Sequence, residues 1–114
     1  MKPGDVALVR FPFADVASAK KRPALILART ARSSRNRLAT VAMITSQIEA
    51  LRLDGDVLLA QWQDAGLLHP SLLRMAKVAT VDEDLIEKAI GRLAAVDHDA
   101  ARAAFRRLFA HWLA

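Results

Sequence analysis

Short runs of apolar residues, bounded by polar or basic residues, recur through the first half of the chain. The residues Asp5–Phe11 alternate and are rich in Val, Leu and Phe, whereas Pro23–Ala28 and Leu38–Ile44 are mostly aliphatic. Runs of roughly four to eight such residues are typical of strands, and Pro12 closes the first run because proline cannot continue a central ladder. We expect three strands, the second and third joined by a long basic hairpin loop.

The pattern continues after Thr45. We expect a turn and a short strand in DGDVLLAQW at 54–62, and another extended segment in SLLRMAKVATV at 71–81. The segment Asp82–Leu85 is typical of a helical turn because its acidic residues cluster at the start. Residues 86–93 fit either a continuation of that helix or a final strand, and periodicity alone leaves both open.

The last segment has the spacing of an amphipathic helix over Asp97–Leu113. We expect Asp97 or Asp99 to cap its N-terminus. Arginines occupy the outer face of this helix. The apolar face is expected to pack into the core and carries Ala101, Phe105, Leu108, Phe109 and Trp112.

Length and composition favour one globular domain over residues 1–114. Hydrophobic residues make up 54% of the chain, which is enough to form a core, and no second composition regime divides it. The absence of cysteine excludes disulfides, thiolate metal sites and cysteine nucleophiles. Asp5 and Arg10 interrupt the first apolar run, so we expect neither a signal peptide nor a membrane span. The expected location is the cytoplasm.

Positive charge is concentrated in one part of a chain whose net charge is +5. The stretch Val16–Ile48 contains no acidic residue. Such a block is typical of phosphate binding, because each neutralised phosphate releases condensed counterions, although a solvated basic loop would look the same. Its basic residues are Lys20, Lys21, Arg22, Arg29, Arg32, Arg35 and Arg37.

Five segments follow one another at a characteristic spacing. They are GDVALVRFPF at 4–13, KKRPALIL at 20–27, VAMITSQ at 41–47, GLLHPSLLRMAKVATVD at 66–82 and IGRL at 90–93. Together they resemble the MazF/PemK-like toxins, in particular the short-loop PemK-like branch. The resemblance covers nearly the whole chain and implies a mainly β, α+β fold: an SH3-like barrel of the PemK/CcdB type with a C-terminal amphipathic helix.

The resemblance also implies an activity. Such toxins of type II toxin-antitoxin systems are endoribonucleases that cleave single-stranded RNA at selected sequences without a metal or other cofactor, and so inhibit translation and growth. The ends expected from metal-free cleavage are a 2′,3′-cyclic phosphate and a 5′-hydroxyl. The resemblance implies a homodimer, held inactive by a cognate antitoxin whose acidic C-terminal tail covers the RNA groove.

The family's functional residues correspond to positions of this chain. Its catalytic arginine precedes the proline of an Arg-Pro motif and falls on Arg22, and its catalytic threonine, in an Ile-Thr motif, falls on Thr45. A further arginine after the Pro-Ser motif falls on Arg74, but the acid that many members carry two residues later is Ala76 here. The residues expected to bind RNA are Lys20, Lys21, Arg29, Arg35, Arg37, Ser46, Gln47 and Ser71.

Metal-free RNA cleavage needs a group that accepts the 2′-hydroxyl proton, one that protonates the leaving 5′-oxygen, and positive charge for the phosphorane. Arg22 would hold the non-bridging oxygens with its fork of donors, and Thr45 and Ser46 would orient the phosphate. We expect His69, which precedes Pro70, to occupy a loop rather than to act in catalysis.

Ala76 leaves a second interpretation open. Some relatives use a carboxylate at that place as the general base, which this chain lacks. The alternative is a non-catalytic protein of the same fold that binds RNA or poisons a protein target such as gyrase, as the related CcdB toxins do. Arg22, Thr45 and Arg74 together favour the enzyme.

Overall fold

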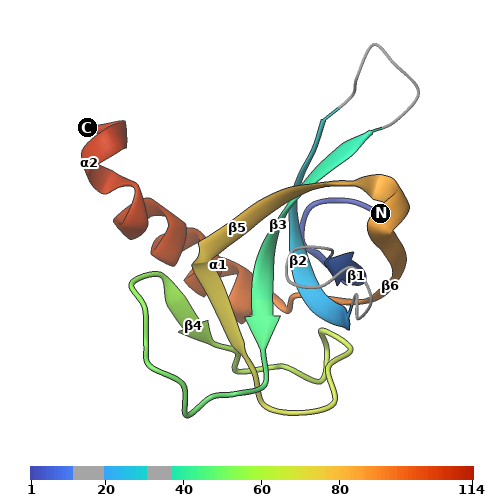
Figure 1. Cartoon of the computed structure of the whole chain (residues 1–114). Coiled ribbons are helices and arrows are strands. Elements are labelled where there is room, and N and C mark those ends of the chain that lie inside the picture. The colour runs from blue at the N-terminus through green and yellow to red at the C-terminus, as the bar shows by residue number, and fades with distance from the viewer. Residues whose placement is uncertain (12–19, 31–36) are drawn as a thin grey trace.

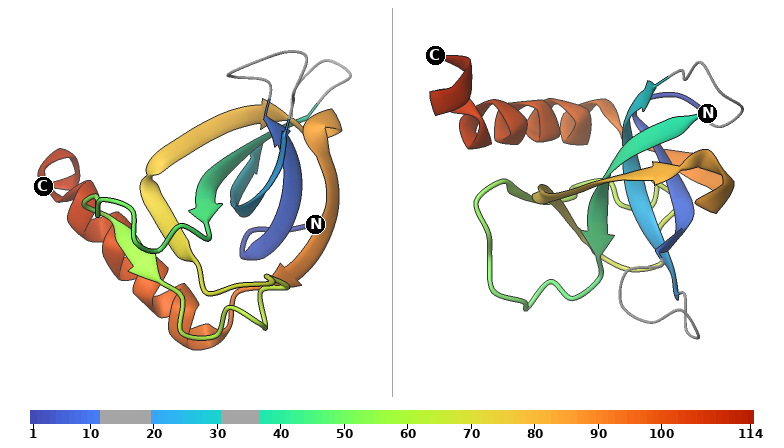
Figure 2. Two further views of the ribbon diagram at one scale, coloured as in Figure 1. Left: turned by 60° about the horizontal axis from the view of Figure 1, so that its bottom comes forward. Right: turned by 45° about the horizontal axis from the view of Figure 1, so that its top comes forward.

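The computed structural model describes residues 1–11, 20–30 and 37–114. Within these residues, six strands form one antiparallel sheet in the order β4-β5-β3-β2-β1-β6. The sheet curls strongly, with the long β5 bent across β3 (Figures 1 and 2). The strands are β1 (Asp5–Phe11), β2 (Lys20–Thr30), β3 (Leu38–Thr45), β4 (Asp56–Leu58), β5 (Leu72–Asp82) and β6 (Ile86–Arg92).

The expected strands are confirmed, and one open alternative is decided. Residues 86–93 contain β6 rather than more helix, and the helical turn before it is the short 3-10 helix η2 (Glu83–Leu85). β6 pairs with β1, so the chain's first and last strands are neighbours. The middle of the basic hairpin, residues 31–36, lies outside the described residues.

Two apolar clusters lie on the two faces of the central strands. Ala24 and Ile26 of β2 belong to one cluster, and Leu25 between them belongs to the other, because successive strand residues point to opposite faces. Both faces of β2 are therefore covered, which explains why its sequence is a continuous apolar run rather than an alternating one.

The C-terminal helix begins two residues earlier than expected, and its predicted cap is wrong. Helix α1 (Ala95–Leu108) has Ala94 as its N-cap. Asp97 lies in the first turn and is 2% exposed. Its two carboxylate oxygens accept hydrogen bonds from the backbone N–H groups of Ala60 (2.7 Å) and Gln61 (2.8 Å). The carboxylate thus ties the chain after β4 to α1 instead of capping the helix.

The aromatic residues of the C-terminal segment are not core residues, contrary to expectation. Besides Asp97, the buried residues of α1 are Ala101 and Ala104, and Leu108 packs partly buried against the same apolar cluster. Phe105 is 40% exposed, and Trp112, on the short helix α2 (Ala110–Leu113), is 85% exposed. The far end of α1 and all of α2 extend beyond the sheet (Figure 2), so Trp112 stays exposed, while Phe105 borders a surface pocket beside β2 without being buried.

Two glycines let the loop after β4 lie directly against β6. A Cβ on Gly66 would lie 2.0 Å from the carbonyl oxygen of Ile90, and one on Gly91 would lie 2.3 Å from the carbonyl carbon of Ala65. Gly66 also has a φ of 78°, a conformation that costs other residues energy. Gly66 begins the segment GLLHPSLLRMAKVATVD at 66–82, and Gly91 lies in the segment IGRL at 90–93. The two segments therefore contact each other through their glycines, and this contact holds the loop after β4 against β6.

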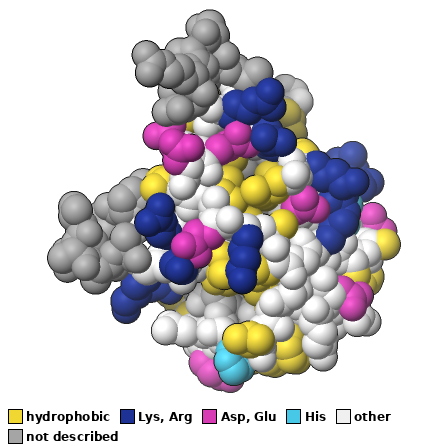
Figure 3. All heavy atoms as spheres, turned by 90° about the vertical axis from the view of Figure 1, so that its right-hand side faces the viewer, with side chains coloured by type: hydrophobic (Ala, Val, Ile, Leu, Met, Phe, Trp, Pro, Cys, Tyr) yellow, Lys and Arg dark blue, Asp and Glu magenta, His cyan; other side chains and the backbone are white. Residues whose placement is uncertain are grey.

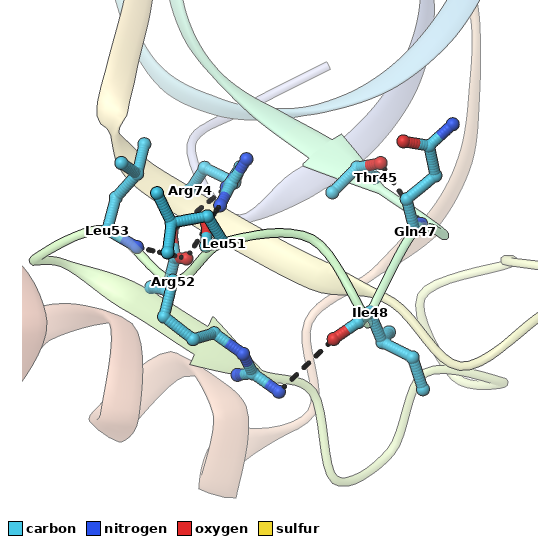
Figure 4. A network of polar contacts seen from close by, with 8 residues as sticks. Thr45, Gln47, Ile48, Leu51, Arg52, Leu53 and Arg74 are labelled. Carbon is cyan, nitrogen blue, oxygen red and sulfur yellow. Dashed lines mark hydrogen bonds and ion pairs between the residues drawn. The ribbon is translucent and has the colours of Figure 1, made fainter.

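A buried ion pair holds the loop between β3 and β4. The Arg74 side chain, 10% exposed, donates from Nε and Nη2 to Oδ1 (3.2 Å) and Oδ2 (3.0 Å) of Asp56, and from Nη2 to the Leu51 carbonyl (2.5 Å). Figure 4 shows Arg74 turned toward Leu51. Burial by itself raises the pKa of Asp56, but hydrogen bonds from Arg74 and from the Leu53 N–H outweigh it, so this pKa lies below its ordinary value.

The substitution Gly91→Ala should lower the free energy of unfolding by about 3 kcal/mol, the upper part of the usual range for overpacking, because the added methyl meets backbone rather than a movable side chain. Urea unfolding followed by circular dichroism measures this. Ala89→Ser, at an exposed position of the same strand, is the control and should change stability by less than about 0.5 kcal/mol. A loss below about 1 kcal/mol for Gly91→Ala would mean that the loop yields easily.

Asp56 should make folding stability sensitive to acid. Its pKa is lower in the folded state than in the unfolded chain, so its contribution is complete above about pH 4 and is lost as the pH falls through the folded-state pKa. Thermal unfolding between pH 7 and pH 2.5 should show a shallower acid decline for Asp56→Asn, from a less stable start. Asp54→Asn, an exposed carboxylate of the same loop, should retain the native slope; equal slopes for Asp56→Asn and the native chain would contradict the assignment.

Candidate functional site

The ladder between the two central strands ends before the strands themselves do. The last pair at this end is Ala24 with Met43, and the next β2 residue is Pro23, which has no N–H to donate. Continuing the same register places Arg22 opposite Thr45. On its other side, Arg22 is paired with Val9 of β1. Arg22 thus lies between β1 and the end of β3.

The space that opens here is a pocket of about 490 Å³. Its apolar wall comes from Leu8, Pro23, Ile44 and Ile90, and the loop 66–69 borders it on another side. The polar lining combines cations, hydroxyls, an amide and an imidazole. These side chains belong to Lys21, Arg22, Lys88, Thr45, Ser46, Ser71, Gln47 and His69.

The turn after β3 presents two hydroxyls and an amide to the pocket. The Thr45 hydroxyl accepts a hydrogen bond from the backbone N–H of Gln47 (3.1 Å) (Figure 4). This bond closes the strand end in a local turn and leaves the hydroxyl proton available for donation. Ser46 and Gln47 are exposed beside it, so a turn-closing role and a ligand-binding role for Thr45 are compatible.

Lys88 is a site residue that sequence reasoning missed. It pairs with Leu8 of β1, which pairs in turn with Pro23, so cross-strand register brings it to the pocket. The sequence left residues 86–93 open between helix and strand, so it could not show that Lys88 lies next to β1 and at the pocket. Within the described residues Arg22 and Lys88 form no ion pair, whereas Lys21 binds Glu87 (Nζ to Oε1, 2.9 Å). Figure 3 shows Lys and Arg side chains, interspersed with acidic ones, on the face that carries β6.

The basic block is divided between the two ends of β2. Lys20, exposed at the start of the strand, shares the end of the sheet with Arg22, whereas Arg29 and Arg37 lie at the other end. β3, which has eight residues, separates those ends by roughly 23 Å at about 3.3 Å per residue. Arg35 and Arg32 lie outside the described residues. The structure therefore does not bring Arg29 and Arg37 to the pocket.

Arg29 already has partners. Its Nε donates to Oε1 of Glu83 (2.5 Å) and its Nη1 donates to the carbonyl of Met1 (2.8 Å). The hydrogen bond from Arg29 holds the pKa of Glu83 below its ordinary value, against the opposing effect of burial. This guanidinium thus joins β2 to η2 and to the N-terminus.

Three positions carried over from the family's Pro-Ser segment have distinct surroundings. The Ser71 residue is 3% exposed and its hydroxyl donates to the His69 carbonyl (2.8 Å). Arg74 is engaged with Asp56 and is not among the residues lining the pocket. Ala76 is exposed on β5 and also lies outside the pocket lining. Of the three, only Ser71 lies at the pocket.

The described residues offer neither a cluster of metal ligands nor a membrane-spanning helix. Across residues 1–11, 20–30 and 37–114, no group of three or more His, Cys, Asp or Glu side chains is placed to hold a metal ion. In the same part of the chain, no helix has the length and apolar character needed to cross a bilayer.

Comparison with known proteins gives the family. A model described as the PemK-like, MazF-like toxin of type II toxin-antitoxin systems matches residues 2–109. The solved structure of Mycobacterium tuberculosis toxin MazF-mt6 is 25% identical with a TM-score of 0.67, over 92% of this chain and 95% of that one. No significantly similar sequence was found among curated proteins.

Two further solved structures, both below 25% identity, share the fold. An endoribonuclease in complex with its cognate antitoxin from a Mycobacterial species is 12% identical with a TM-score of 0.69, over 96% of this chain and 95% of that one. A MazE-MazF structure from Deinococcus radiodurans is 16% identical with a TM-score of 0.66, over 96% and 94%. The expected mainly β fold with a C-terminal helix is confirmed. Since the family model spans nearly all of the sequence, the protein belongs to the PemK-like, MazF-like toxins of type II toxin-antitoxin systems.

Proposed function

We propose that this toxin is a metal-independent endoribonuclease that cleaves single-stranded RNA at a short sequence and thereby stops translation and growth. The observation that carries the proposal is the pocket where β2 and β3 part, which is lined by both Arg22 and Thr45. These residues are 23 positions apart in sequence and each lies in a family motif. The names of two similar structures, which describe endoribonucleases, point the same way.

Arg22 stabilises the transition state. Its guanidinium is charged at all relevant pH values and offers a planar fork of donors to two non-bridging phosphate oxygens. Lys88 of β6 adds a second cation to the pocket lining. In this proposal Thr45 and Ser46 donate hydroxyl protons that fix the phosphate. A preorganised contact of the Arg22 kind typically contributes about 3 to 4 kcal/mol to the transition state.

In this proposal, Arg74 positions the loop between β3 and β4 and does not bind RNA itself. Its guanidinium is buried and committed to Asp56 and the Leu51 carbonyl. That contact fixes the loop between β3 and β4, whose first residues are Ser46 and Gln47. Arg74 therefore keeps the RNA-binding turn in place without touching the phosphate itself.

The partners follow from the same surfaces. We propose a cognate antitoxin whose acidic C-terminal tail occupies the cationic pocket and excludes RNA; the names of two similar structures describe antitoxin complexes.

The homodimer implied by the family would cover apolar side chains that this chain exposes on α1 and α2, such as Phe105 and Trp112. Toxin, antitoxin and RNA meet in the cytoplasm. The basic hairpin, including Arg29, Arg35 and Arg37, is proposed to contact RNA outside the pocket.

Arg22→Ala should lower the rate of RNA cleavage by about 10² to 10³-fold or more, the loss expected for a transition-state donor, and should relieve growth arrest. Its fold should be retained, because the side chain is exposed. Single-turnover cleavage and circular dichroism measure the two properties. Arg106→Ala, an exposed arginine on α1, is the matched control and should remain active. A folded and fully active Arg22→Ala protein would refute the site.

The cleavage products should carry a 2′,3′-cyclic phosphate on the upstream fragment and a 5′-hydroxyl on the downstream one, and cleavage should persist in EDTA. A single 2′-deoxy substitution at the cleaved nucleotide should block the reaction, because it removes the nucleophile and leaves every phosphate available for binding. Mapping the ends from a mixed RNA pool tests this. Ends with 3′-hydroxyl and 5′-phosphate would require a different mechanism, and RNA binding without cleavage would favour the non-catalytic alternative that Ala76 raises.

A further inference from the structure

The roles proposed above for the described lining residues leave one chemical requirement of the reaction unmet. Attack by the 2′-hydroxyl needs a group that accepts its proton. Of the described residues that line the pocket, none is a carboxylate, and the charged ones, Lys21, Arg22 and Lys88, are cations. The place where many family members carry an acid is Ala76, which is exposed on β5 outside the lining.

Although the sequence alone led us to expect a loop residue without a catalytic role at position 69, the structure places His69 in the pocket lining, where it can fill this role. Imidazole is the only side chain whose ordinary pKa lies between pH 5 and 8, so its neutral form can take up a proton under mild conditions. The imidazole shares the pocket with Arg22 and Thr45. Lysine and arginine side chains are protonated under these conditions, and the hydroxyls of Thr45 and Ser46 are too weakly basic to take their place.

The turn that carries His69 is fixed although its side chain is exposed. On its C-terminal side, the Ser71 hydroxyl donates to the His69 carbonyl (2.8 Å), and the Ser71 carbonyl accepts from the Leu59 N–H (3.0 Å). On its N-terminal side, Gly66 lies against the Ile90 carbonyl. A buried hydroxyl and a glycine contact thus hold the backbone on both sides of a short exposed turn at the edge of the pocket, which limits the region that the His69 side chain can reach.

We infer that His69 is the general base of this toxin, an inference that rests on the proposed endoribonuclease function. The neutral imidazole takes the proton of the 2′-hydroxyl while the 2′-oxygen forms a bond to phosphorus. The bond between phosphorus and the 5′-oxygen breaks, and that oxygen takes a proton from water. The hydroxide so formed removes the proton from the imidazolium, so His69 is restored and no net water is consumed.

The charged groups around the imidazole are assigned separate tasks. Lys21 and Arg22 of β2 and Lys88 of β6 line the pocket together with His69; the carboxylate of Glu87, also on β6, binds Lys21 (2.9 Å). Arg22 and Lys88 bind the phosphate that carries the developing charge. This separation explains how a pocket whose described lining residues include no carboxylate can support both phosphate binding and proton removal.

The test uses the intact protein and a single-stranded RNA cleaved by it. His69→Gln and His69→Ala should each lower kcat by about 10² to 10⁴-fold, the usual contribution of a general base, with little change in KM. The native enzyme should lose activity at acidic pH as the base is protonated, and this acid limb should be absent from the residual activity of His69→Gln. Added imidazole should partly restore His69→Ala. His98→Gln on α1, a histidine that lines a different surface pocket, should behave as the native enzyme.

The outcomes separate this inference from the function on which it rests. If the native chain cleaves RNA to cyclic phosphate ends and His69→Gln does so within about threefold of its rate, with the same acid limb, His69 is not the base and the endoribonuclease assignment stands. A lower rate in His69→Gln with an unchanged acid limb, and no rescue of His69→Ala by imidazole, would also overturn the role. If the native chain does not cleave the RNA pool, both proposals are wrong.

Discussion

The close approach of Gly66 to the backbone of β6 is the contact on which the organisation of the pocket depends. A methyl group at Gly66 or Gly91 would overlap backbone atoms of the other segment, so no larger residue allows the same geometry. This contact fixes the loop from one side, and the buried Asp97 carboxylate fixes it from α1 by accepting two of its N–H groups. These two contacts also position the turn that carries His69, because that turn directly follows Gly66 in the chain.

The wall of the pocket formed by β2 and β3 depends on the point at which the hydrogen-bonded ladder between these strands ends. Pro23 cannot extend the ladder between β2 and β3, so the ladder ends at Ala24 and Met43, and Arg22 and Thr45 lie beyond it, where both line the pocket. A residue with an N–H at that position would allow the ladder to continue and would leave less room between the strands. The family's Arg-Pro motif thus combines a charged donor with the residue that opens space beside it.

The sequence predicts the strands well because most are short apolar runs between polar turns, and the resemblance supplied the pairing of Arg22 with Thr45. It could not place Lys88, whose position depends on β6 lying next to β1. It also could not show that Asp97 binds backbone N–H groups of residues far away in sequence, since an aspartate near a helix start looks the same as a cap. The aromatic residues of α1 and α2 were misassigned because helical periodicity identifies an apolar face but not the surface that covers it.

The described cations differ in whether an acidic side chain neutralises them, and this difference separates those that hold the fold together from those available to bind a ligand. Lys21, which lines the pocket, is paired with Glu87, and four described cations outside it are also paired with acids: Arg29 with Glu83, Arg74 with Asp56, Arg92 with Asp5 and Arg102 with Asp99. Within the described residues, Arg22 and Lys88 make no such pair. Unpaired cations in a recess attract phosphate and carboxylate alike, so RNA and an acidic antitoxin tail would compete for the same two side chains. Under the proposed function, inhibition by occupation of the pocket would require no conformational change in the toxin.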